Sequence, residues 1–73
     1  MKKIAINIFV NGVNYTSNYD DFTEDREDYA KGMLKKAARG ELLHLEFKSD
    51  DKHLFFSSEI LRQAIMSIIY CEI

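Results

Sequence analysis

Alternating apolar and polar positions open the chain and predict a strand over residues 3–10, with its isoleucines and Val10 on one face. Asn11-Gly12 follows, a dipeptide that readily adopts the two positive φ angles of a type I′ turn. The predicted hairpin has the pairs Val10 with Val13, Ile8 with Tyr15 and Ile4 with Tyr19. Turn and pattern agree, because this register brings the apolar residues of both strands to one face.

Helical spacing then replaces alternation. Thr23 is a good N-cap, acids fill the first turn, and Gly40 is a left-handed stop after a basic last turn. Between these ends the apolar residues recur at helical spacing: Tyr29, Ala30, Met33, Leu34, Ala37 and Ala38. Gly32 costs about 1 kcal/mol relative to alanine inside a helix, which suggests close contact with a neighbouring backbone.

A second hairpin and a closing segment complete the pattern. If Asp50-Asp51 forms the turn, Phe47 faces Leu54 and Leu45 faces Phe56, so the large apolar residues again share one side. Ser57 or Ser58 can cap the final segment, whose apolar stripe favours a helix. The stripe consists of Ile60, Leu61, Ala64, Ile65, Ile68 and Ile69. The last residues are also rich in β-branched and aromatic types, so an additional strand over residues 67–73 is the alternative.

The predicted fold is a single α+β domain over residues 1–73. Its order is ββαββα, and the expected two-layer form has a four-stranded antiparallel sheet with both helices on the face that carries Ile6 and Leu45. The opposite face is expected to be open.

Composition narrows the classes of function. A chain of 73 residues buries little core, and its single cysteine cannot form an internal disulfide, so self-association, most simply as a homodimer, is the expected supplement. No apolar run is long enough for a membrane span, and Met1-Lys2-Lys3 leads into a strand, so a cytoplasmic location is expected. The net charge of −2 gives no global attraction to nucleic acid or acidic membranes.

Two surfaces are the candidate binding sites. The open sheet face is expected to display Phe9 and Phe55 among polar residues, which resembles a recognition surface or a contact with another subunit. The acids around the start of the first helix form the second candidate, either as an anionic patch for a basic partner or as a solvated helix N-terminus. These acids are Asp20, Asp21, Glu24, Asp25, Glu27 and Asp28.

No arrangement for catalysis or for holding a cofactor is evident. His44 and His53 share the expected open face with Glu46, but their predicted strand partners differ, so a metal or acid–base role is not expected. Cys71 has an acidic neighbour and not the electropositive surroundings that activate a thiol, and no phosphate loop or nucleophile elbow occurs.

The sequence therefore predicts a non-enzymatic binding protein without metal or cofactor. It would occupy a cellular protein, as small inhibitors of phages and mobile elements do, through the open face or the acidic helix start. A homo-oligomer that sequesters a small ligand is the alternative, with pockets between subunits lined by Tyr15, Tyr19, Tyr29 and Asn or His side chains. A nucleic-acid-binding module is the second alternative, with only Lys3, Lys48 and Lys52 to supply charge near the open face.

Overall fold

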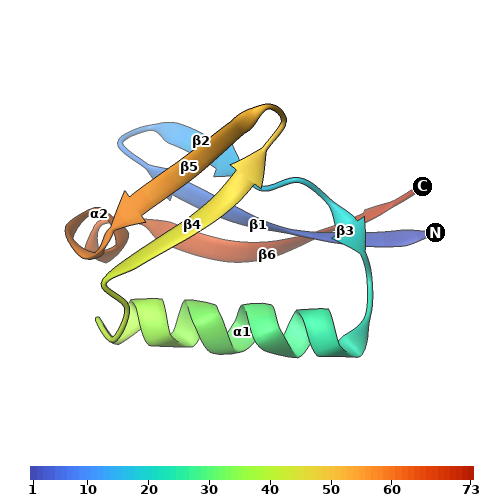
Figure 1. The fold of residues 1–73 in the computed structure, drawn as a ribbon, viewed down its shortest axis with the longest axis horizontal. Coiled ribbons are helices and arrows are strands. Elements are labelled where there is room, and N and C mark those ends of the chain that lie inside the picture. Colours follow the sequence, from blue (N-terminus) through green and yellow to red (C-terminus); the bar gives the residue numbers. More distant parts are fainter.

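The computed structural model describes all 73 residues as one α+β unit, and Figure 1 shows its layers. In chain order the elements are β1 (Lys2–Val10), β2 (Val13–Thr16), β3 (Asp20–Asp21), α1 (Glu24–Ala38), β4 (His44–Ser49), β5 (Lys52–Ser57), α2 (Ser58–Arg62) and β6 (Ile65–Glu72). Neither helix has the length and apolar character that crossing a bilayer requires. The predicted α+β class, with two helices and antiparallel strands, is confirmed.

The first hairpin is confirmed in its turn and in most of its register. Asn11 and Gly12 have φ angles of 53° and 77°. The β1–β2 ladder pairs Val10 with Val13 and Ile8 with Tyr15 as predicted, but Ile4 pairs with Asp20 of β3 and not with Tyr19. The pairing shifts by one residue because the chain between β2 and β3 leaves the ladder, where the Asn18 N–H donates to the Lys48 carbonyl, 2.8 Å away.

Helix α1 begins and ends where the sequence predicts. The Thr23 hydroxyl accepts a hydrogen bond from the Arg26 N–H at 3.1 Å, and Gly40, just past the helix, takes a φ of 73°. The suggested backbone contact at Gly32 is wrong, because a methyl group added there would meet nothing within 4 Å.

The second hairpin has the predicted register, with Leu45 paired to Phe56 and Phe47 to Leu54. Asp50 takes a φ of 55° in its turn. Ser57 then caps α2, and its hydroxyl accepts from the Ile60 N–H at 3.3 Å.

The last segment forms a strand, which was the alternative to a helix in the sequence analysis. Helix α2 ends at Arg62, and β6 follows from Ile65 to Glu72, longer than the predicted strand. It pairs antiparallel with β1 along its whole length, from Phe9–Ile65 to Lys2–Glu72. A helix running through this segment is therefore wrong.

The four-stranded sheet exists, but its strands differ from the prediction. β2 and β3 lie along one edge of β1 and β6 along the other, while β4 and β5 form a separate two-stranded sheet. Both edges of β1 are paired within this sheet, and neither strand of the second hairpin pairs with it.

The core lies between these layers. Ile8 is fully buried, and Leu45 and Leu61 are each only 2% exposed. The buried cluster joins β1 to both helices and to the hairpin, since it contains Ile8, Val10, Ala37, Leu45, Phe56 and Leu61. Both helices thus cover the isoleucine face, as predicted. No helix covers the opposite face of the four-stranded sheet, which we call the open face.

Candidate functional site

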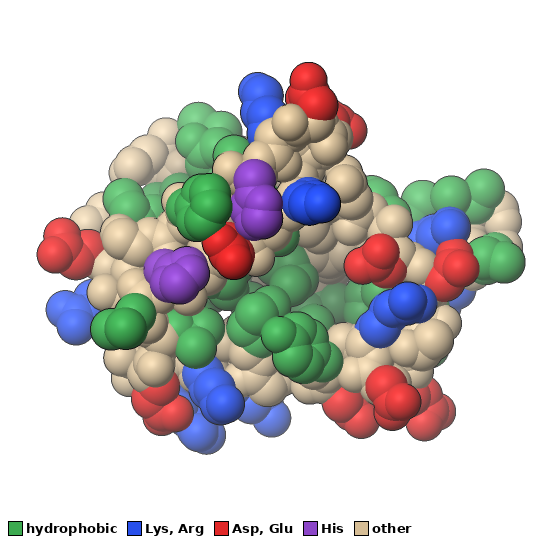
Figure 2. Space-filling model, in the orientation of Figure 1, with side chains coloured by type: hydrophobic (Ala, Val, Ile, Leu, Met, Phe, Trp, Pro, Cys, Tyr) green, Lys and Arg blue, Asp and Glu red, His purple; other side chains and the backbone are tan.

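A hollow of about 690 Å³ separates α1 from β4. Ile4 and Ile6 of β1 line it, Tyr29 and Met33 come from α1, and Phe47 comes from β4. In Figure 2 hydrophobic side chains line the recess between the lower helix and the hairpin above it. The site is therefore apolar inside and open to solvent on one side.

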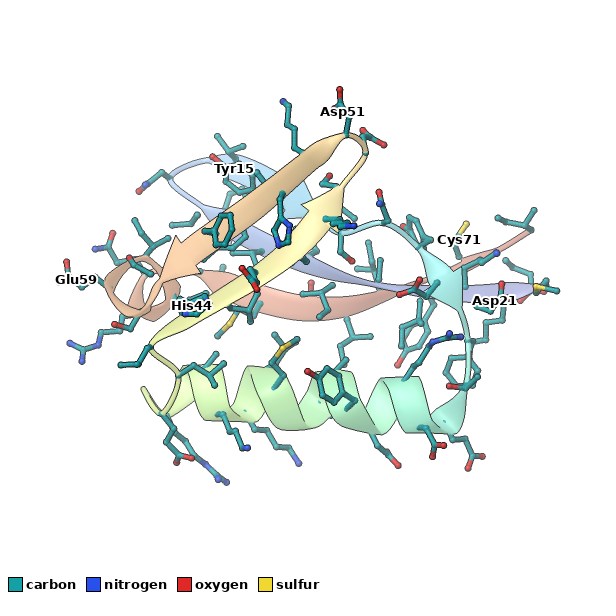
Figure 3. All side chains as sticks on the ribbon, in the orientation of Figure 1. Tyr15, Asp21, His44, Asp51, Glu59 and Cys71 are labelled. Carbon is teal, nitrogen blue, oxygen red and sulfur yellow. The ribbon has the colours of Figure 1, made fainter.

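A second hollow, of about 500 Å³, continues this recess toward the C-terminal part of α1. It shares Tyr29, Met33 and Glu46 with the first and adds Lys36 and His44 among others. Figure 3 shows His44 at the end of the hairpin opposite the Asp51 turn. The two hollows form one recess along the helix, which we call the α1–β4 groove.

The groove is bordered on one side by an unpaired strand edge. In a two-residue hairpin the pair beside the turn exchanges both hydrogen bonds, and bonded and non-bonded pairs then alternate. Ser49–Lys52 is the pair beside the turn, so Glu46 and His44 lie in non-bonded pairs. Their N–H and C=O groups point away from β5, and none of them has a hydrogen-bond partner elsewhere in the chain.

Asn18 already uses one end of this edge. Its N–H donates to the Lys48 carbonyl, and its side-chain oxygen accepts from the Asp50 N–H at 2.7 Å. The chain thus pairs its own backbone with β4 where the groove begins, and leaves the edge beyond it free.

The predicted acidic surface divides into groove and non-groove residues. Asp20 and Asp25 line the first hollow and Asp28 the second, and none of the three forms an ion pair. Glu24 is exposed in the first turn of α1 and lines neither hollow.

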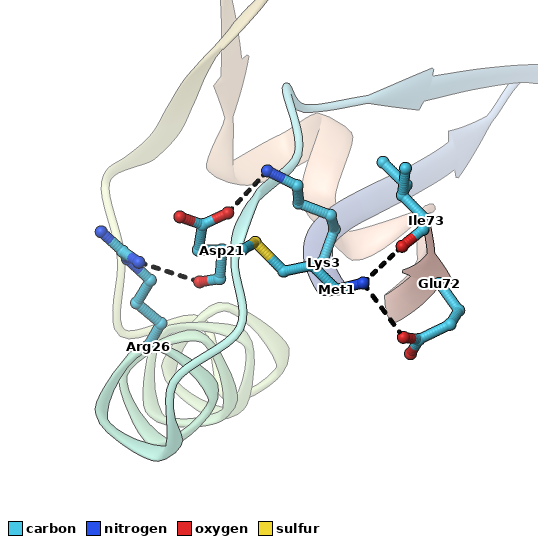
Figure 4. Close-up of polar contacts among 6 residues, drawn as sticks. All are labelled: Met1, Lys3, Asp21, Arg26, Glu72 and Ile73. Atoms are coloured by element: carbon cyan, nitrogen blue, oxygen red, sulfur yellow. Dashed lines mark hydrogen bonds and ion pairs between the residues drawn. The ribbon is translucent and has the colours of Figure 1, made fainter.

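Asp21 has a structural contact instead. Lys3 Nζ donates to Asp21 Oδ1 at 2.6 Å, and the Asp21 carbonyl accepts from Arg26 Nη1 at 2.8 Å (Figure 4). The hydrogen bond and charge of Lys3 lower the pKa of the Asp21 carboxyl below its usual 3.8. The same view shows the ammonium group of Met1 joined to the Ile73 carbonyl and to Glu72. The Met1 nitrogen lies 3.3 Å from Glu72 Oε1.

Glu27 has a partner that the sequence analysis did not anticipate. The Tyr70 hydroxyl donates to Glu27 Oε2, which lowers the pKa of Glu27 below 4.5 and raises the pKa of Tyr70 above 10.0. The Lys2 ammonium lies 4.8 Å from the centre of the Tyr70 ring. These contacts hold the start of α1 against β6.

Phe9 and Phe55, expected on one face, lie on opposite sides of the core. Each is the strand neighbour of buried core residues, so its side chain points away from the core, but Phe9 is in β1 and Phe55 in the separate hairpin. Phe9 is 37% exposed and Phe55 is 66% exposed. They cannot act together as one flat recognition surface.

The structure brings both histidines to Glu46 on the outer side of the hairpin. His53 Nε2 lies 3.5 Å and His44 Nε2 lies 4.0 Å from Glu46 Oε2, and the His53 ring stacks on Phe55 with ring centres 4.8 Å apart. No group of three possible ligands among histidine, cysteine and the acids is placed to hold a metal ion. Cys71 is half-buried in β6.

Sequence reasoning found the acids of the groove but missed its interior. Ile6, Met33 and Phe47 were assigned to the core, and they do pack against it while lining the groove. The only signal for the groove in the sequence was the pair of apolar faces on α1 and β4, and their separation depends on long-range packing.

No model of a known protein family matches this chain, and no curated protein or solved structure matches it either.

Proposed function

We propose that this protein is a non-enzymatic interaction protein that binds a segment of a partner protein in the α1–β4 groove. One observation carries the proposal: an open apolar recess of about 690 Å³ whose rim carries unpaired charges. Binding sites are typically concave and mostly apolar, with a few polar groups that fix orientation. The groove has this composition.

The groove walls suit a polypeptide. Met33 has a flexible side chain that adapts to different shapes, and Tyr29, at 73% exposure, offers a rigid ring with a polar end. Asp20, Asp25 and Asp28 add negative charge along the α1 side. The acidic helix start, proposed as a partner surface from the sequence, therefore borders the groove.

In its finer form the proposal is an inhibitor that acts by occupying its partner, as accessory proteins of phages and mobile elements do. Asp21 would then support the groove through its carbonyl, which holds the groove residue Arg26, while Phe55 and the two histidines would extend the contact over the outer side of the hairpin.

Site-specific photo-crosslinking tests the proposal. A photoreactive phenylalanine analogue replaces Tyr29 on the groove rim, and the matched control replaces Phe9 on the open face. We expect Tyr29 to give one discrete adduct in the native cells and the adduct peptide to map to a single segment of the partner. That segment, made as a peptide, should bind the purified chain.

Met33→Glu and the charge reversals Asp25→Lys and Asp28→Lys should each weaken binding of that peptide by about tenfold, which corresponds to roughly 1.4 kcal/mol. Glu24→Lys is the matched control, since Glu24 lies outside the groove. Adducts that form only at Phe9, or a peptide whose affinity none of the groove variants changes, would exclude the groove as the binding site.

A small organic ligand is the second candidate, because the volume of the groove lies within the range of small-molecule sites. The predicted ligand pocket between subunits included Tyr29, which here lines a groove within one chain. Native mass spectrometry of protein purified from its own cells separates the two candidates, since it would show either a retained small molecule or a protein partner.

A further inference from the structure

We infer that the bound segment is an extended strand that adds to the free edge of β4 and that it alternates apolar with basic residues. The inference rests on the proposed function and specifies the conformation and chemistry of the partner in that same groove. Three features support it: the unpaired backbone of β4, the apolar interior, and the acids on the rim.

The backbone of β4 supplies the first feature. His44 and Glu46 direct N–H and C=O groups into the groove, and Lys48 directs its N–H the same way. Alternate residues of a strand are about 6.6 Å apart, so these groups have the spacing that an added strand requires. Asn18 shows that this edge accepts backbone pairing, because its N–H already bonds to the Lys48 carbonyl at 2.8 Å.

The interior determines one face of the added strand. A strand beside β4 would direct alternate side chains toward the core, where Ile4, Ile6 and Met33 line the groove. Those positions should carry apolar residues. Peptide recognition by strand addition usually works in this way, with main-chain bonds giving affinity and pockets for alternate side chains giving specificity.

The rim determines the other face. Outward side chains of the added strand would lie between Glu46 on β4 and Asp25 and Asp28 on α1. The cations along the groove are Arg26, Lys36 and Lys48, and Arg26 is already bonded to the Asp21 carbonyl. Like charges side by side in a sheet are destabilising and opposite charges are favourable, so lysine or arginine is preferred opposite Glu46.

A model peptide provides the test. The probe is acetyl-Lys-Val-Lys-Val-Lys-amide, titrated into the full chain by calorimetry. Two further peptides carry backbone N-methyl groups, one on the lysines and the other on the valines. Because successive N–H groups of a strand point to opposite edges, only one of these peptides should lose binding, by about fivefold or more for the lost hydrogen bonds.

The identity of the weakened peptide reports the strand direction. In an antiparallel pair the residues that bond to Glu46 have their side chains on its outward face, so methylated lysines would block binding. In a parallel pair the intervening valines would bond instead. Either result supports strand addition. Equal affinities for all three peptides, or no binding of the unmethylated probe, would overturn it.

The charge preference has its own control. A peptide with glutamate in place of each lysine should bind at least tenfold more weakly, and Glu46→Lys should reduce this preference while Glu24→Lys leaves it unchanged. Equal binding of both peptides to the unaltered chain would overturn the basic preference.

Failure of this inference can be told apart from failure of the proposed function. Suppose that Tyr29 crosslinks a partner and Met33→Glu abolishes its binding while N-methylation has no effect. The groove would then remain the binding site, and strand addition alone would be wrong.

Discussion

At the residue scale, one hydrogen bond connects the start of α1 to the last strand. Glu27 accepts it from Tyr70, 43 positions away in the sequence, and the Lys31 ammonium lies 3.7 Å from Glu27 Oε1. Because the bond favours the ionised carboxylate, it stabilises the fold above the unfolded pKa of Glu27. This stabilisation is lost as the pH falls through the lower pKa of the folded state.

Replacing Tyr70 by phenylalanine removes this hydrogen bond but keeps the ring. We expect the pKa of Glu27 to rise toward 4.5, part of the way because Lys31 and Lys2 still lower it. The variant should be less stable than the unaltered chain at pH 7 and equally stable at a pH below the folded pKa of Glu27.

A pH titration of the Glu27 carboxyl carbon by NMR, together with urea unfolding at both pH values, measures these changes. Tyr29→Phe is the control, since the Tyr29 hydroxyl makes no hydrogen bond within the chain. An unchanged pKa of Glu27 would show that Tyr70 does not hold the carboxylate.

Contacts at this scale were predictable from sequence only where they are local. Asn11-Gly12, Thr23 and Ser57 act on residues within three positions, and the structure confirms all of them. The Glu27–Tyr70 bond joins distant residues, and no local signal indicates it.

At the element scale, helix α1 contains a residue that lowers the stability of the helix. Gly32 lies in the helix interior, and space is free around its α-carbon. Glycine costs about 0.5–1 kcal/mol relative to alanine in such a position, because it loses more backbone freedom on folding.

Gly32→Ala should therefore raise the free energy of unfolding by about 0.5–1 kcal/mol, measured by urea denaturation. Gly12→Ala is the matched contrast. An added methyl group at Gly12 would also meet nothing within 4 Å, but Gly12 has a φ of 77°, which alanine adopts only with strain. Gly12→Ala should therefore destabilise the fold by a similar amount. Destabilisation by Gly32→Ala would mean that a neighbour packs on this glycine.

The sequence predicted the individual elements better than their pairing. The stripe that contains Ile65, Ile68 and Ile69 fits a helix, yet these residues lie in β6, where Ile65 and Ile69 share one face and Ile68 lies on the other. The deciding factor is the edge of β1, where Ala5 pairs with Ile69 from 64 positions away, because the N–H and C=O groups of that edge need partners. Periodicity within one window cannot report that need.

At the scale of the whole molecule, the pairing of β6 with β1 determines which strands make up the four-stranded sheet. With β6 on one edge of β1 and β2 and β3 on the other, the second hairpin packs across the sheet, and the α1–β4 groove lies between it and the helix. The acids of the site were predictable because they crowd one helix start. The groove itself was not, because it depends on which strands share a sheet.

The predicted homodimer stays a prediction, and the open face is the surface through which we expect it to form. Ile65, at 67% exposure, pairs with Phe9 across β1 and β6, and the two form an apolar area that no helix covers. We expect Ile65→Lys to shift the chain toward monomer in light scattering at micromolar concentration, because a charge there opposes burial. Phe55→Lys, on the other side of the core, should leave the assembly unchanged. An unaltered chain that is monomeric under these conditions would contradict this expectation.

The central claim is that the free edge of β4 is the docking edge of the groove, and hydrogen exchange of the Glu46 amide tests it most directly. In the free chain this N–H has no partner, so it should exchange rapidly, while the neighbouring Phe47 amide, paired with Leu54, is protected. Saturation with the lysine–valine peptide or with the crosslinked partner segment should slow exchange at Glu46 at least tenfold. A Glu46 amide that exchanges equally fast with and without the bound segment would contradict the account.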